Sequence, residues 1–74
     1  MRTFNDAKGD PWQVAVMDGS YGGVALIFGR LGGGDVLQRP LDAEAANLAQ
    51  AEELVARLDE AGLRTFLDEA TAWT

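Results

Sequence analysis

Glycine is distributed unevenly along this chain, and the distribution divides the chain in two. Eight of the nine glycines and both prolines lie within residues 1–41, and only Gly62 lies within residues 42–74. Glycine and proline interrupt regular structure, so the first part predicts short strands joined by turns. The second part is rich in alanine and has neither residue from Asp42 to Leu58, which favours helix. A chain of 74 residues is long enough for one small domain, so we expect a single domain over residues 1–74.

Two stretches of the first part alternate as strands do. In WQVAVMD and VALIF, every second residue is a large apolar one that would share one face: Trp12, Val14, Val16, Val24, Leu26 and Phe28. The run around Phe4 and the segment DVLQR, which stops at Pro40, add shorter strands. The turn residues between these segments suit antiparallel neighbours, joined either by a tight hairpin at Asp18-Gly19 or by a longer loop around Ser20 and Tyr21. Residues 1–41 therefore predict a β-meander of three or four antiparallel strands.

The acidic part, residues 42–74, repeats apolar residues at helical spacing. Asp42 is placed to cap a first helix. In one interpretation Asp59 caps a second helix, with Leu58 and Leu63 as a hydrophobic staple. In the other, Gly62 ends a single first helix. The first interpretation gives each apolar residue a place, and it predicts an α+β fold with two C-terminal helices packed on one face of the meander.

The glycine-rich stretch FGRLGGGDVL raises the question of a phosphate-binding loop. Such a loop needs a lysine followed by serine or threonine at the start of a helix. Here Asp35 follows Gly34, and a strand-like segment follows Asp35. The carboxylate would repel a phosphate. The stretch therefore predicts a hairpin connection and not a nucleotide site.

Few residues of the chain are suited to catalysis. There is no cysteine and no histidine. Ser20 has no histidine to activate it, and Lys8, the only lysine, lies in a polar turn. Neighbouring carboxylates such as Glu52 and Glu53 diverge by about 100° around a helix axis, so they do not converge on a substrate. The sequence therefore predicts no enzyme, and it indicates no catalytic, cofactor-binding or metal-binding residues.

The net charge of −6 belongs entirely to the second part. Residues 1–41 hold four basic and four acidic side chains, whereas residues 42–74 hold eight acids against Arg57 and Arg64. Such a surface repels nucleic acids and anionic membranes. The polar start MRTFNDAKGD lacks the apolar core of a signal peptide, so we expect a cytoplasmic protein that binds neither nucleic acid nor membrane.

The alternating strands also have a second face, which is expected to be apolar. It would carry Ala15, Met17, Ala25 and Ile27, where a solvated sheet usually carries polar side chains. Tyr21 and Leu31 would lie in loops nearby, and Gln13, Arg39 or Trp73 would shield the patch if it is covered. The candidate interaction residues are Ala15, Met17, Tyr21, Ala25, Ile27 and Trp73.

The partner of this patch is expected to be a protein, with a homodimer through the sheet face as one possibility. An alternative function uses the acidic half instead, as a mimic of nucleic acid that occupies the basic groove of a partner. Acids spaced like phosphates are needed for that role, and Arg57 and Arg64 partly neutralise them.

The opening M-R-T-F-x-D-x-x-G-x-x-W-x-V resembles that of short bacterial proteins of unassigned function. The resemblance implies the same order of strands followed by helices along nearly the whole chain. It carries no catalytic motif, and so it implies no functional residue.

Overall fold

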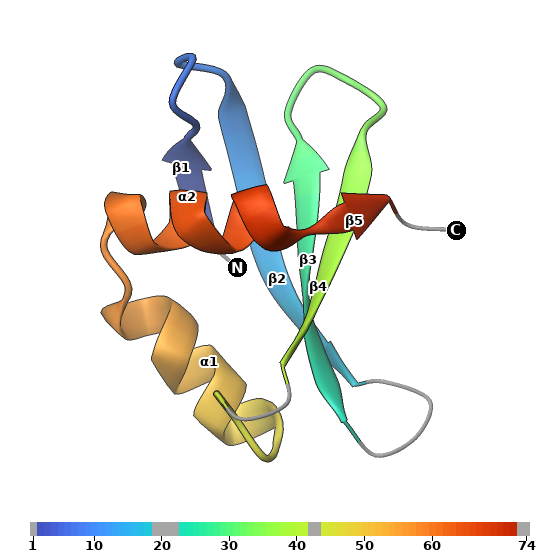
Figure 1. Cartoon of the computed structure of the whole chain (residues 1–74), viewed down its shortest axis with the longest axis vertical. Helices are drawn as coiled ribbons and strands as arrows, with labels where there is room; N and C mark the ends of the chain where they lie inside the picture. The colour runs from blue at the N-terminus through green and yellow to red at the C-terminus, as the bar shows by residue number, and fades with distance from the viewer. Residues whose placement is uncertain (1, 19–22, 42–43, 73–74) are drawn as a thin grey trace.

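A five-stranded antiparallel sheet, covered on one side by two helices, makes up the fold (Figure 1). The computed structural model describes residues 2–18, 23–41 and 44–72. Its elements are β1 (Arg2–Asn5), β2 (Pro11–Asp18), β3 (Val24–Arg30), β4 (Val36–Leu41), α1 (Leu48–Arg57), α2 (Glu60–Glu69) and β5 (Thr71–Ala72). The strands lie in the sheet in the order of the chain. The predicted α+β class, with an antiparallel meander before two helices, is confirmed.

The short strand β5 is an addition to the predicted layout. After α2 the chain returns to the sheet, and Thr71 and Ala72 pair with Gln38 and Leu37 of β4. A strand of two residues has no alternation that a sequence can show. It forms because the preceding helix ends beside the free edge of β4. A tertiary contact, and not the local sequence, therefore causes β5 to form.

The strand register confirms the predicted apolar face. Val14 lies opposite Phe28, and Val16 lies opposite Leu26. Directly opposite residues point to the same side of a sheet, so these four side chains share one face. The helices pack on this face, and Phe4 of β1 meets the Phe28 ring edge-on at 6.0 Å between centroids.

Side chains from both layers close the core. Its fully buried large side chains are Val14, Leu26 and Phe28 from the sheet and Leu63 from α2. The rest of the core cluster consists of Phe4, Trp12, Val24, Leu41, Ala45, Ala51, Val55 and Leu67. Val16, Leu48, Leu58 and Phe66 are only partly buried against this cluster.

The first helix starts later than predicted. Its N-cap is Asn47, whose side chain accepts a hydrogen bond of 2.9 Å from the Gln50 amide. Gln50 in turn accepts a hydrogen bond from the Ala46 amide. The predicted cap Asp42 lies outside the described residues, and residues 44–47 are not helical. In the described part of the connection between β4 and α1, residues 44–47, Ala45 is buried in the core.

The second helix begins as predicted. The Asp59 side chain accepts a hydrogen bond of 2.8 Å from the Gly62 amide. Gly62 lies inside α2 and does not have a positive φ, so the alternative in which it ends α1 is wrong. A side chain at position 62 would meet a Leu58 methyl at 2.8 Å, because Leu58 packs back over the first turn. Glycine is the residue that leaves room for this staple.

The glycine-rich stretch forms the connection of a hairpin, as predicted. It joins β3 to β4, which pair antiparallel. The Arg30 amide donates to the Asp35 carbonyl at 3.0 Å, and Gly32 has a φ of 81°. Glycine adopts that conformation without strain. No helix follows the loop, so the geometry of a phosphate-binding loop is not formed.

Because Asn47 is the cap of α1, the substitution Asn47→Ala is expected to lower the free energy of unfolding by about 1 kcal/mol. The control Asn47→Asp keeps a side-chain acceptor and is expected to change stability by much less. Urea unfolding followed by circular dichroism measures both. Equal losses in the two variants would show that the side-chain hydrogen bond is not what fixes the start of the helix.

Candidate interaction surface

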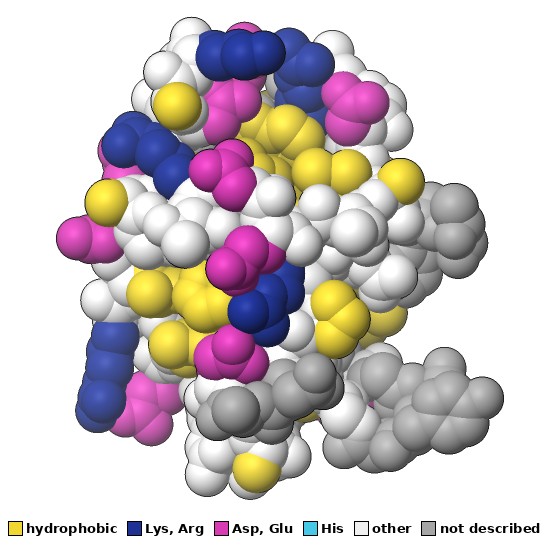
Figure 2. All heavy atoms as spheres, in the orientation of Figure 1, with side chains coloured by type: hydrophobic (Ala, Val, Ile, Leu, Met, Phe, Trp, Pro, Cys, Tyr) yellow, Lys and Arg dark blue, Asp and Glu magenta, His cyan; other side chains and the backbone are white. Residues whose placement is uncertain are grey.

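The face of the sheet opposite the helices carries no charged side chain among the residues that the structure describes. The strand registers place on it Thr3, Asn5, Pro11, Gln13, Ala15, Met17, Ala25, Ile27, Gly29, Val36, Gln38, Pro40 and Thr71. These residues are called the charge-free face below. The helix-covered side is different: Figure 2 shows basic and acidic side chains spread over it. Charge therefore separates the two faces of the molecule.

The four strand residues predicted for this surface lie together at its centre. Ala15 lies opposite Ile27, and Met17 lies opposite Ala25, so they form two successive cross-strand pairs. Met17 is 36% exposed, whereas Ala15 and Ile27 are half-buried. Ala25 is only 6% exposed, because Met17 and Pro40 flank it on either side. Ala25 thus lets neighbouring side chains approach and offers little contact area itself.

Two other predicted residues, Tyr21 and Trp73, lie outside the described residues. Leu31 is in the β3–β4 loop and is 42% exposed. The contribution of β4 was not predicted, although Val36 is also 42% exposed and shares the face with Gln38. The signal was present in the alternation of VLQRPL, where the even-numbered residues are uncharged.

Arg39 does not shield this surface. It lies opposite Leu26 and therefore points to the helix side. Its guanidinium lies 5.0 Å from the centre of the Phe66 ring and forms ion pairs of 3.0 Å with Glu44 and with Glu69. These carboxylates raise the pKa of Arg39, the hydrogen bond to Glu44 having the largest effect. Of the two strand residues expected as shields, only Gln13 lies on the charge-free face.

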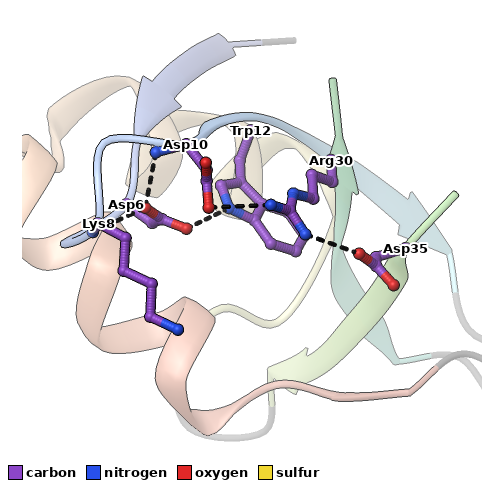
Figure 3. A network of polar contacts seen from close by, with 6 residues as sticks. All are labelled: Asp6, Lys8, Asp10, Trp12, Arg30 and Asp35. Atoms are coloured by element: carbon purple, nitrogen blue, oxygen red, sulfur yellow. Dashed lines mark hydrogen bonds and ion pairs between the residues drawn. The ribbon is translucent and has the colours of Figure 1, made fainter. Parts of the chain in front are cut away.

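The polar cluster at the β1–β2 turn is the other concentration of functional groups (Figure 3). Asp6 is its centre: one oxygen accepts hydrogen bonds of 2.9 Å from the amides of Lys8 and Asp10, and the other accepts one of 2.8 Å from Trp12 Nε1. Gly9, in the same turn, has a φ of 89°. Asp6 therefore holds the hairpin closed and fixes the indole ring.

Arg30 completes the cluster from β3. It pairs with Asp10 at 3.0 Å and with Asp35 at 3.2 Å. The two carboxylates raise the pKa of Arg30, and the hydrogen bond to Asp35 contributes most. A hollow of about 260 Å³ lies beside the cluster and also touches Leu67 and Asp68 of α2. Asp6 and Arg30 both bind other groups of the protein, and their contacts close the β1–β2 and β3–β4 turns. The cluster provides no activated nucleophile.

The other described regions indicate no cofactor or ion site. Among the described residues, no three acidic side chains lie close enough to hold a metal ion. Neither α1 nor α2 has the length and hydropathy of a helix that crosses a bilayer. Comparisons of the chain with family models, with curated proteins and with solved structures found no match. The charge-free face is thus the candidate site.

The Asp6 cluster makes stability depend on pH in a defined direction. The hydrogen bond from Trp12 lowers the pKa of Asp6 below its ordinary value of 3.8, against the opposing effect of desolvation. The amides of Asp10 and Lys8 and the charge of Arg30 act in the same direction as Trp12. A carboxylate with a lowered pKa stabilises the fold above its ordinary pKa, and this stabilisation is lost as the pH falls through the lowered value.

We therefore expect Asp6→Asn to destabilise the protein at neutral pH, and the difference from the wild type to shrink once the pH falls below about 4. Asn has one oxygen acceptor, so it cannot satisfy the turn amides and the indole N–H together. Chemical unfolding at a series of pH values measures the difference. Asp18→Asn, at the exposed end of β2, controls for the loss of one negative charge. A difference for Asp6→Asn that stays constant with pH would contradict the assigned role.

Proposed function

We propose that this protein is a small non-catalytic module for protein–protein interaction, and that the charge-free face is its contact surface. The main support is the absence of charged side chains from that face among the described strand residues, in a chain with a net charge of −6. Removing a charge from water costs several kcal/mol unless the charge is paired. A face without charges therefore loses little when a partner covers it.

The size of the surface suits a reversible contact. The 25 residues of β1 to β4, at about 3.3 Å per residue and about 4.8 Å between strands, give an area of about 400 Å². Two partners would together bury about 800 Å², which is below the range of stable complexes and within that of weak, transient ones. Small residues at the centre, Ala15, Ala25 and Gly29, allow a second surface to approach closely. Met17 and Val36 supply the exposed apolar contacts on either side.

A second copy of the chain fits the charge distribution. Two sheets that pack on each other lie about 10 Å apart. Each acidic helical layer then lies on the outer side of its own sheet, so about 30 Å separates the two layers. That distance exceeds the screening length of about 8 Å at physiological salt, and their mutual repulsion is small. We propose that the protein forms a homodimer through its charge-free faces.

No observation favours the alternative function as an acidic mimic of nucleic acid. Arginines of the same helices partly neutralise the carboxylates of α1 and α2. Arg57 pairs with Glu53, and Arg64 pairs with Glu60 at 3.1 Å. Arg39 forms two further ion pairs with acids on the helical side. Binding by a mimic would weaken strongly as salt rises, whereas apolar contact through the sheet would persist.

We expect light scattering over a hundredfold dilution to show a dimer that dissociates as the protein is diluted. Met17→Glu combined with Ile27→Glu is expected to abolish the dimer, because both place a charge at the centre of the contact. Ala56→Glu, on the exposed side of α1, adds the same kind of charge elsewhere and is the control. Circular dichroism verifies that each variant is folded.

A monomeric mass for the wild type at every concentration would contradict the homodimer. The same measurements at high salt distinguish apolar contact through the sheet, which persists, from binding by an acidic mimic of nucleic acid, which weakens. If the Met17 and Ile27 changes also leave capture of a host protein and stability unaltered, the charge-free face has no role in binding and the proposal fails.

A further inference from the structure

Gly29 is a glycine inside a strand, and the fold supplies no reason for it. It lies in β3, between Gln13 of β2 and Val36 of β4. The glycines with a positive φ lie in turns, whereas Gly29 does not have a positive φ. The glycine of α2 leaves room for Leu58, but a Cβ atom added at position 29 would meet no other atom of the described residues within 4 Å.

Glycine at this position lowers the stability of the strand. It loses more conformational freedom on folding than any other residue, and a β-branched residue would favour the strand. The described part of the chain would accept such a residue at position 29 without a collision. Glycines inside strands often mark a place where another molecule or backbone approaches closely. The space above Gly29 is therefore explained by something that lies against the sheet.

The space above Gly29 forms a notch in the charge-free face. Gln13 and Val36 flank it on the neighbouring strands, and Ile27 lies on the same face of β3 two residues earlier. Val36 is 42% exposed, so its side chain rises beside the glycine. This Gly29 notch, bounded by Gln13, Ile27 and Val36, has room for the end of one apolar side chain.

The symmetry of the proposed homodimer brings an exposed side chain to the notch. When two copies meet through the same face, the two-fold axis lies in the plane between the two sheets. An axis that crosses the strands near the Ala15–Ile27 pair exchanges the rows on either side of that pair. The row of Met17 in one copy then lies over the row of Gly29 in the other. An axis along the strands would instead place Met17 over the row of Ala25, which is only 6% exposed and offers no such space.

We propose that each Met17 of the homodimer enters the Gly29 notch of the other copy, so that these two residues determine how the faces dock. The inference rests on the proposed homodimer. Met17 is 36% exposed, and its unbranched thioether side chain has the rotational freedom to reach the neighbouring strand and fill an irregular space. The contact occurs twice in the dimer, once for each copy.

The substitution Gly29→Val fills the notch and tests its role. Urea unfolding, at a dilution where the wild type is monomeric, is expected to show stability equal to or above that of the wild type. Sedimentation equilibrium is expected to show a dissociation constant of the dimer raised by about tenfold or more, because both notches are overfilled. Gly34→Val adds the same side chain in the β3–β4 loop, where a Cβ also meets nothing within 4 Å, and is expected to leave the dissociation constant unchanged.

Mixing two variants identifies the side chain that occupies the notch. Met17→Ala alone is expected to weaken the dimer, because both notches are left empty. In a mixed dimer of Gly29→Val with Met17→Ala, the added valine faces the shortened side chain, and the remaining Met17 faces the remaining notch. This mixed dimer is expected to be tighter than either variant homodimer by about tenfold. Gly29→Val mixed with Gln13→Ala is the control and is expected to show no such gain.

The outcomes separate this inference from the proposed function. A wild type that is monomeric at every concentration would overturn the homodimer and the role of Met17 with it. A wild-type dimer that Gly29→Val does not weaken would overturn the role of the notch alone, as would a gain with Gln13→Ala in place of Met17→Ala. A loss of monomer stability in Gly29→Val would show that the fold itself requires the glycine, which also contradicts the inference.

Discussion

Two helices of ten residues each can cover one face of this sheet and no more. Each helix is about 15 Å long. Together they cover the face that carries Val14, Leu26 and Phe28, and Leu63 of α2 is fully buried against that layer. The described residues hold no further helix or strand for the opposite face. That face must therefore be stable in contact with water or with a partner, and its composition of small, neutral and apolar residues follows from this constraint.

Arginine side chains attach the acidic helical layer to the neutral sheet. Arg2 of β1 donates to the carbonyls of Val55 and Leu58 at the end of α1, where the helix dipole is negative. Arg39 of β4 stacks on Phe66 of α2. Arg64 of α2 donates back to a main-chain carbonyl of β1 at 2.8 Å. Because the arginines of the sheet point toward the helices or the turns, the other face is left without charge.

The sequence was a good guide wherever one residue or a regular alternation determines the structure. Asp59 caps α2 because its side chain is adjacent to the amides that need an acceptor. The alternation in β2 and β3 assigned residues to both faces of the sheet, and it put Ala15, Met17, Ala25 and Ile27 together on one of them. Phe4, Asp6, Gly9, Trp12 and Val14 of the opening segment build the β1–β2 hairpin and its core.

The sequence-based predictions were wrong where a part of the chain that is distant in sequence determines the local structure. The composition of residues 42–47 favours helix, but the burial of Ala45 at the end of the sheet delays α1 until Asn47 supplies a cap. The alternation of VLQRPL puts Arg39 on the opposite face from Gln38, but only the pairing of β3 with β4 shows which of these two faces the helices cover.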